Sequence, residues 1–105
     1  MHVSGATGSH STKVNGVYLP SEEMYNGSRL YSKEGDKDKW LLLAKDGTWM
    51  VADTDDKEEN DSSGYCYCEV GLAHPTLGKT WEVAGEDEFE EQAGFTVTSL
   101  VREII

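Results

Sequence analysis

Residues 39–53 read KWLLLAKDGTWMVAD, two apolar runs joined by the dipeptide Asp46-Gly47. An Asp-Gly dipeptide between such runs is the strongest short-range sign of a β-hairpin. The first run, residues 40–44, is apolar on both of its alternating faces. A strand with two apolar faces is typical of the middle of a sheet that is covered on both sides. The sequence therefore predicts a hairpin at the centre of a small β-structure.

Further short alternating segments surround this hairpin and are separated by glycine or proline turns. Pro20 is expected to end the strand before it, because proline cannot donate to a ladder. The acidic residues 53–64 are assigned to an irregular mobile loop, and residues 22–25 and 86–91 to helical turns. The remaining expected strands cover residues 3–7 at a sheet edge, 14–19, 29–33, 65–70, 79–83 and 94–101.

Together these segments predict an all-β fold of about seven short strands. The strands are arranged as a small antiparallel sheet, a sandwich or a partly closed barrel. At 105 residues and 11.6 kDa the chain has room for one core, so residues 1–105 are taken as a single β module. The apolar fraction is only 37%, and the mean hydropathy is −0.57. Each aromatic side chain buries about 150–250 Å², so we assign most of the aromatic residues to packing: Trp40, Trp49, Trp81, Tyr18 and Tyr31.

The net charge is −11, from 9 Lys and Arg against 20 Asp and Glu. A nucleic-acid partner is excluded, because phosphate neutralisation requires clustered basic side chains. The acidic field also disfavours anionic membranes, and no apolar run approaches the roughly 20 residues of a membrane span. The expected partner is a protein or a neighbouring domain with a basic surface, and the chain itself is expected to be a monomer.

Cys66 and Cys68 are separated by a single residue, Tyr67. On a strand the two thiols share a face at about 6.5–7 Å, too far apart for relaxed disulfide geometry. Free cysteines indicate a reducing compartment, so we expect a cytoplasmic protein. Residues 1–12 lack the basic and apolar regions of a signal peptide. We expect a module excised from a longer multidomain chain, whose location the parent protein sets.

The landmarks taken together resemble a small β module that is repeated in large multidomain proteins of protists and algae. Its loose pattern combines Asn-Gly-x-Tyr, Trp-x-Val and Gly-x-x-Trp-x-Val. The resemblance covers nearly the whole chain and implies a small antiparallel β domain of no established activity, although residues 53–64 and the cysteine pair depart from the pattern. The matching segments are residues 4–8, 15–18, 26–31, 40–41, 49–51, Tyr65, Pro75, 78–83 and 95–97.

An acidic loop offers the most suggestive group of metal-ligating residues. Calcium takes six to eight oxygen ligands, and several carboxylates of one loop can supply them. The EF-hand pattern is absent, because Lys57 stands at an acidic position and no glycine follows. A solvated loop is the alternative explanation. The candidate Ca²⁺ ligands are Asp53, Asp55, Glu58, Glu59 and Asp61.

Other chemistry finds little support in the sequence. Cys66, Cys68 and His74 lack the Cys-x₂₋₄-Cys spacing of structural zinc sites, so no cofactor is expected. No nucleophile stands beside a base in a recognisable motif, so we expect no enzyme activity. If an aromatic residue binds a ligand, Tyr25 and Tyr67 are the candidates, because both lie near loops or point outward.

The sequence therefore predicts a non-enzymatic protein-interaction or spacer module of a larger protein. The alternative is a ligand-binding module, which holds a carbohydrate on aromatic residues or Ca²⁺ in the acidic loop 53–61.

Overall fold

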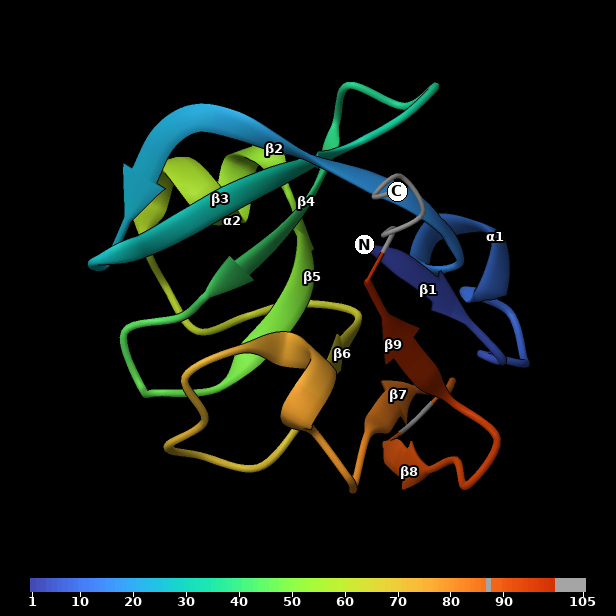
Figure 1. Ribbon diagram of the computed structural model, residues 1–105. Helices are drawn as coiled ribbons and strands as arrows, with labels where there is room; N and C mark the ends of the chain where they lie inside the picture. Colours follow the sequence, from blue (N-terminus) through green and yellow to red (C-terminus); the bar gives the residue numbers. More distant parts are fainter. Residues whose placement is uncertain (87, 100–105) are drawn as a thin grey trace, which may run out of the picture.

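The computed structural model describes residues 1–86 and 88–99, which form a single antiparallel sheet of nine strands (Figure 1). The predicted all-β antiparallel class is confirmed, with nine short strands in place of about seven. The strands are β1 (His2–Ser4), β2 (Gly16–Tyr25), β3 (Ser28–Lys33), β4 (Lys39–Leu43), β5 (Trp49–Asp53), β6 (Cys66–Tyr67), β7 (Glu82–Ala84), β8 (Phe89–Glu91) and β9 (Thr96–Thr98). The helices are short: α1 (Ser11–Val14), α2 (Thr54–Glu59) and the 3₁₀ turn η1 (Pro75–Leu77).

The sheet order is β8-β7-β6-β5-β4-β3-β2-β1-β9. Each strand from β2 to β8 lies beside its predecessor, and among the described strands only β9 breaks the meander by returning to pair with β1. The sheet curls as a half-barrel, so that β9 comes back towards β7 and β8 (Figure 1). Trp81, before β7, stacks on Phe95, before β9, with ring centroids 4.7 Å apart. The two edge strands, β8 and β9, are thus near each other without pairing.

The predicted central hairpin is present as β4 and β5, in register from Lys39↔Asp53 to Leu43↔Trp49. Its two apolar faces are both buried, as predicted. Leu41 belongs to the main core on the concave side, and Leu42 belongs to a second cluster on the convex side.

Four of the five aromatic residues that the sequence assigns to packing lie in the main core, and the fifth, Trp40, is half-buried against the second cluster. Trp49 and Trp81 are each 2% exposed, and Tyr18 and Tyr31 are buried with them. Burial raises the pKa of the Tyr18 hydroxyl, which donates to Val14 O at 2.8 Å. The other members are Met1, Val3, Ala6, Val14, Leu41, Val51, Cys66, Cys68, Val83, Phe95 and Val97.

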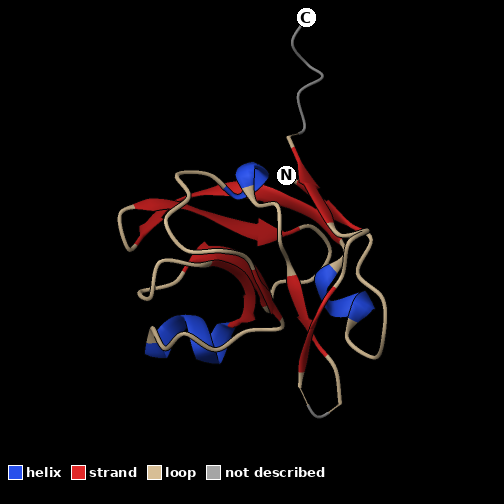
Figure 2. Cartoon of the chain, turned by 90° about the horizontal axis from the view of Figure 1, so that it is seen from below, coloured by secondary structure: helices blue, strands red, loops and turns tan. Residues whose placement is uncertain are grey.

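The convex cluster consists of Leu30, Leu42, Ala44, Met50 and Ala52. Helix α2 lies against this side of the sheet (Figure 2). Trp40 Nε1 donates to Thr54 Oγ1 at 3.0 Å, and Lys57 Nζ lies 4.7 Å from the centroid of the Trp40 ring.

The prediction of an irregular loop over residues 53–64 is wrong for its first half, which forms α2. Asp53 caps the helix by accepting from Asp56 N at 3.1 Å. Asn60 ends it in the left-handed conformation, with φ +53°. An Asp before an acidic first turn and an Asn after the last are the usual start and stop signals of a helix. The strong negative charge of the segment is also typical of a solvated loop, which is why the sequence alone predicts a loop here.

Strand β2 is longer than predicted and runs through Pro20 to Tyr25, so residues 22–25 are strand and not a helical turn. β1 pairs only with Gly16 and Val17, which leaves the outer half of β2 paired on one side. A proline is tolerated there because its missing donor lies on the unpaired side. The register also shifts between Pro20 and Met24. Asn26 and Gly27, both at positive φ, then close the hairpin in a type I′ turn.

Two other expectations need correction. Residues 3–7 were expected at a sheet edge, yet β1 lies between β2 and β9. Residues 86–91 were expected to be helical, yet Phe89–Glu91 form the edge strand β8. The strand expected over 94–101 is present as β9, while residues 100 and 101 lie outside the described residues. Within the described part, no helix has the length and apolar character of a membrane span.

Candidate functional sites: an acidic edge and a carboxylate cluster

One edge of the sheet is acidic. Among the strands of the described residues, β8 pairs only with β7, in the register Val83↔Glu90 and Glu82↔Glu91. Residues directly opposite in an antiparallel pair share a face, so Glu90 lies on the same concave face as the core residue Val83. Glu88, two residues earlier, is expected on that face as well. We call β8 with Glu88, Glu90 and Glu91 the acidic edge; all three residues are exposed.

Inward glutamates explain why the sheet stays open at this edge. A carboxylate that points towards the concave side must stay hydrated, because an unpaired charge is very costly to bury. Closure of β8 onto β9 would remove that water from Glu88 and Glu90. Native proteins use inward-pointing charges on an edge strand in this way to block unwanted pairing.

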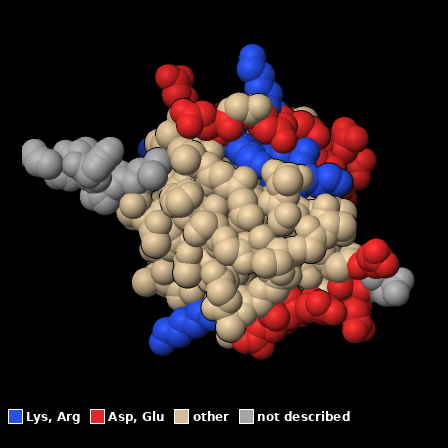
Figure 3. All heavy atoms as spheres, turned by 90° about the vertical axis from the view of Figure 1, so that its right-hand side faces the viewer, with Lys and Arg blue, Asp and Glu red and all other residues tan. Residues whose placement is uncertain are grey.

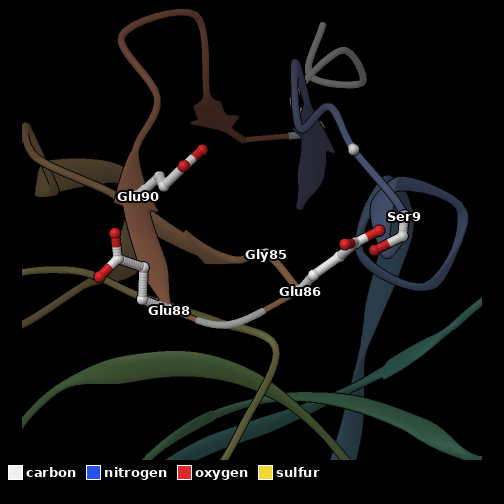
Figure 4. Close-up of a pocket in the computed structure, with 6 residues that line it drawn as sticks. Ser9, Gly85, Glu86, Glu88 and Glu90 are labelled. Atoms are coloured by element: carbon white, nitrogen blue, oxygen red, sulfur yellow. The ribbon is translucent and has the colours of Figure 1, made fainter.

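Beside the acidic edge is a hollow of about 390 Å³, here called the acidic hollow. Figure 4 shows Glu86 directed towards Ser9, with Glu88 and Glu90 on the other side of the hollow. Gly8 and Gly85 complete the lining. Within the described residues none of the three glutamates is part of an ion pair. The hollow therefore concentrates uncompensated negative charge and suits a cationic group.

A second acidic group lies at the end of α2. Carboxylate oxygens of Asp56, Glu59 and Asp61 all lie within 4.8 Å of one another, and we call these residues the carboxylate cluster. Positions 56 and 59 are three residues apart and so share a helix face. The left-handed Asn60 then turns the chain back and brings Asp61 to the same place.

The carboxylate cluster differs from the ligand set that the sequence predicts. Of the five candidates the structure brings together Glu59 and Asp61, and it adds Asp56, which the sequence analysis missed. Asp53 caps α2 and also accepts from Tyr65 Oη at 3.3 Å. Glu58 pairs with the neighbouring Lys57 at 3.1 Å, and Asp55 is exposed.

The pKa of Asp56, one member of the carboxylate cluster, is shifted. The pKa of Asp56 is raised to about 6, first by burial and then by the nearby carboxylates of Asp53 and Asp61. A raised carboxyl pKa means that the ionised form is under-compensated. A divalent cation would supply the missing positive charge, and three carboxylates offer part of the six to eight oxygens that Ca²⁺ takes.

The two candidate binding tyrosines are half-buried and make contacts within the chain. Tyr25 Oη donates to Lys57 O at 2.7 Å and so ties the β2–β3 hairpin to α2. Tyr67 Oη donates to Glu82 Oε1 at 3.1 Å, and its ring lies 5.0 Å from that of Phe89. Phe89, the first residue of β8, is 39% exposed and so places an exposed aromatic side chain on the acidic edge itself.

The residues considered as zinc ligands or nucleophiles are buried in the core or make contacts within the chain. Cys66 and Cys68 are free, buried and on the same core face, as predicted. Burial raises the pKa of Cys66 to about 12 and that of Cys68 to about 11, so both thiols stay protonated and are poor nucleophiles. His74 Nδ1 lies 2.7 Å from Thr76 Oγ1 at the start of η1.

A comparison of the chain with protein-family models, with curated proteins and with solved structures finds no significant match.

Proposed function

We propose that the chain is a non-enzymatic interaction module of a larger cytoplasmic protein, which binds a basic, extended segment of a partner at the acidic edge. The observation that carries the proposal is the coincidence, at one edge strand, of open backbone groups and uncompensated carboxylates. Edge strands commonly bind extended peptides by adding a strand to the sheet. Main-chain hydrogen bonds then supply affinity, and alternate side chains supply specificity.

The charge pattern selects the partner. A second copy of this acidic chain, or any acidic segment, is repelled by Glu88, Glu90 and Glu91. A segment with Lys or Arg at alternate positions places its cations on the concave side, next to Glu88, Glu90 and the acidic hollow. Phe89 lies on the opposite side of the strand and offers an apolar contact to the intervening residues.

The test uses a synthetic peptide of about eight alternating lysine and threonine residues, the length of a typical strand. Titration is followed by amide chemical shifts of the full chain. We expect the shifts to concentrate on residues 82–91 and the affinity to fall as NaCl is added. The double variant Glu88→Gln and Glu90→Gln is expected to weaken binding about tenfold, the effect of about 1.4 kcal/mol.

A matched control removes the same charge elsewhere. Glu22 and Glu23 are exposed on β2, away from the acidic edge, and their double change to Gln leaves the net charge equal to that of the test variant. We expect it to change the affinity less than about twofold. Equal weakening by both variants would show that the peptide responds only to the net charge and not to β8, and the proposal would fail.

A second candidate function is Ca²⁺ binding at the carboxylate cluster, supported by the convergence of three carboxylates and the raised pKa of Asp56. Three protein carboxylates predict a weak site, with a dissociation constant of about 10⁻⁴–10⁻³ M. Titration with CaCl₂ is expected to shift the amides of residues 56–61, and Asp56→Asn is expected to abolish those shifts. Mg²⁺ at equal concentration controls for screening. Unchanged spectra at about 1 mM Ca²⁺ would exclude this function.

The carbohydrate alternative gains no comparable support. Trp49 and Trp81 are in the main core, and Trp40 is half-buried beneath Lys57. A stacking platform needs exposed aromatic faces, and the tryptophans of this chain are used for packing.

A further inference from the structure

The convex side of the acidic edge carries two aromatic rings and two glutamates. The registers Tyr67↔Glu82 and Glu82↔Glu91 place these three residues in one row across β6, β7 and β8. Tyr67 packs against the convex cluster, so the row lies on the convex face. Phe89 is two residues before Glu91 on β8 and therefore shares that face. We call Tyr67, Glu82, Phe89 and Glu91 the convex site; the acidic hollow is on the other side of the strand.

The two rings of the convex site form an aromatic surface that is open to solvent. Their centroids lie 5.0 Å apart, with 54° between the ring planes. Phe89 is 39% exposed, and Tyr67 is half-buried. Burial and the carboxylate of Glu82, which accepts from Tyr67 Oη at 3.1 Å, raise the pKa of the Tyr67 hydroxyl, so this ring stays neutral. The face of a neutral aromatic ring carries partial negative charge and attracts cations.

The two glutamates of the convex site break a rule of strand pairing. Glu82 and Glu91 are directly opposite on neighbouring strands, where like charges destabilise the pair. Within the described residues neither glutamate is part of an ion pair. The hydroxyl of Tyr67 is a neutral donor and compensates neither charge. Natural proteins break such local rules mainly at functional sites, and a bound cation would supply the missing compensation here.

The charge around β8 favours the approach of a cation. Figure 3 views the β1 and β9 side of the molecule and shows acidic side chains along its lower margin, the level at which β8 lies in Figure 1. A wide area above that margin carries no Lys, Arg, Asp or Glu. The negative potential on this side is therefore concentrated near β8, and the net charge of −11 adds to it.

The combination of rings and carboxylates distinguishes arginine from lysine. A guanidinium group is planar and weakly hydrated, stacks on aromatic faces and donates two parallel hydrogen bonds to a carboxylate. The ammonium group of lysine is compact and strongly hydrated, so it gains less from a ring. Among the described residues the lining of the acidic hollow contains no aromatic side chain, so the concave side does not make this distinction.

We propose that the convex site binds an arginine side chain of the partner segment, with the guanidinium plane over the Phe89 ring and its N–H groups directed at Glu91 and Glu82. The inference rests on the proposed function, because the added strand brings the arginine to β8. Side chains of that strand alternate between the two faces. The partner therefore has an arginine on the convex side, flanked in its sequence by two basic residues that face Glu88, Glu90 and the acidic hollow.

The test compares peptides that differ at one position. In the alternating lysine and threonine peptide, the fourth residue, a threonine, is replaced by arginine, lysine or leucine. Binding to the full chain is followed by amide chemical shifts. We expect the arginine peptide to bind about fivefold more tightly than the lysine peptide of equal charge, the size of one cation–π contact at an exposed site. The leucine peptide is expected to bind more weakly than both.

Variants of the chain assign the preference to the convex site. The ratio of the arginine-peptide to the lysine-peptide affinity is expected to fall to about one in Phe89→Leu, which removes the ring, and to be retained in Phe89→Tyr. Glu91→Gln is expected to weaken the binding of both peptides. Glu34→Gln is its control of equal charge, because Glu34 is exposed in the turn after β3, and it should change either affinity less than about twofold.

A small probe separates this inference from the proposed function. Nα-acetyl-arginine amide presents the same guanidinium group but is too short to add a strand, and Nα-acetyl-lysine amide is its control. At millimolar concentrations the arginine probe is expected to shift the ring signals of Tyr67 and Phe89 more than the lysine probe does. If no peptide binds at β8, the proposed function fails, and this probe still decides whether the convex site exists.

Three results would each overturn the inference. The first is equal affinity of the arginine and lysine peptides for the wild-type chain. The second is a leucine peptide that binds as tightly as the arginine peptide, which would show that Phe89 offers an apolar contact only. The third is a set of Tyr67 and Phe89 ring signals that respond equally to the two small probes.

Discussion

At the scale of single residues, Asp56 couples the carboxylate cluster to stability. Its pKa is raised to about 6 in the folded chain, against 3.8 as the reference value for the unfolded state. The folded state therefore holds the proton more tightly. The favourable contribution of this group is fully present below about pH 3.8 and is lost as the pH rises through about 6.

Asp56→Asn removes the charge and keeps the backbone N–H that Asp53 caps. We expect the free energy of unfolding at pH 7 to rise by about 0.5–1 kcal/mol, a figure reduced for the partial exposure of the cluster. At pH 4.5 the gain should shrink, because wild-type Asp56 is then protonated. Urea denaturation at the two pH values measures both effects. Asp55→Asn, exposed in the same helix, is the control; a loss of stability at both pH values in Asp56→Asn would contradict the assignment.

At position 5 the backbone conformation and the lack of space for a side chain both require glycine. It has φ +90°, and a Cβ placed there would lie 2.0 Å from Gly94 O. Gly5→Ala is therefore expected to lower the free energy of unfolding by about 2–4 kcal/mol, because backbone strain and a clash with backbone coincide. Thermal and urea denaturation check this. Gly94→Ala, whose Cβ meets nothing within 4 Å and whose φ is not in the strained region, should be tolerated; equal losses would contradict this reading.

At the scale of elements, α2 is held by side-chain contacts to the hairpin beneath it. Tyr25 Oη donates to Lys57 O, and Asn26 and Asn60 exchange side-chain hydrogen bonds at 2.9 and 3.2 Å. A six-residue helix is not stable alone in water, so these contacts and the burial of Trp40 account for its presence.

Tyr25→Phe is expected to lower the free energy of unfolding by about 0.5–1 kcal/mol, since the carbonyl of Lys57 loses the Tyr25 donor and keeps only Asn60 N. The loss should be local, with faster hydrogen exchange of the α2 amides. Tyr67→Phe is the comparison, because its hydroxyl bonds to Glu82 and not to α2. If exchange in α2 is unchanged in Tyr25→Phe, this hydroxyl does not anchor the helix, and a binding role for Tyr25 becomes the better explanation.

At the scale of the whole molecule, the net charge of −11 opposes compactness. The ion pairs of the described residues involve only Lys39 and Lys57, so most carboxylates are uncompensated. We expect Tm to rise by about 4–8 °C, the effect of about 1 kcal/mol, between 0.01 M and 0.5 M NaCl.

Calorimetry of the wild type and of Glu22→Lys with Glu34→Lys tests this effect, since both glutamates are exposed and neither is in an ion pair of the described residues. The variant brings the net charge closer to zero, so its Tm should depend less on salt. An equal salt dependence in the two proteins would indicate a general salt effect on burial of apolar surface and not a screened repulsion.

The sequence alone determined the features that depend on neighbours in the chain. Asp46-Gly47 and Asn26-Gly27 specify tight turns, and the run at 40–44 specifies a strand buried on two faces, because these signals are local. The all-β class and the interior position of the tryptophans follow from them. The helix signals at Asp53 and Asn60 are equally local and are present in the sequence. The prediction of a loop followed the negative charge of the segment instead of these two signals.

The tertiary structure decided what depends on residues far apart in the chain. The return of β9 to β1 leaves β8 and β9 as the two edges of the sheet, and the pairing of β6, β7 and β8 assembles the convex site. The convergence of Asp56, Glu59 and Asp61 likewise needs the left-handed turn at Asn60. A charge pattern along the chain can be assigned to a surface only when the strand order is known, because pairing between distant strands sets which residues share a face.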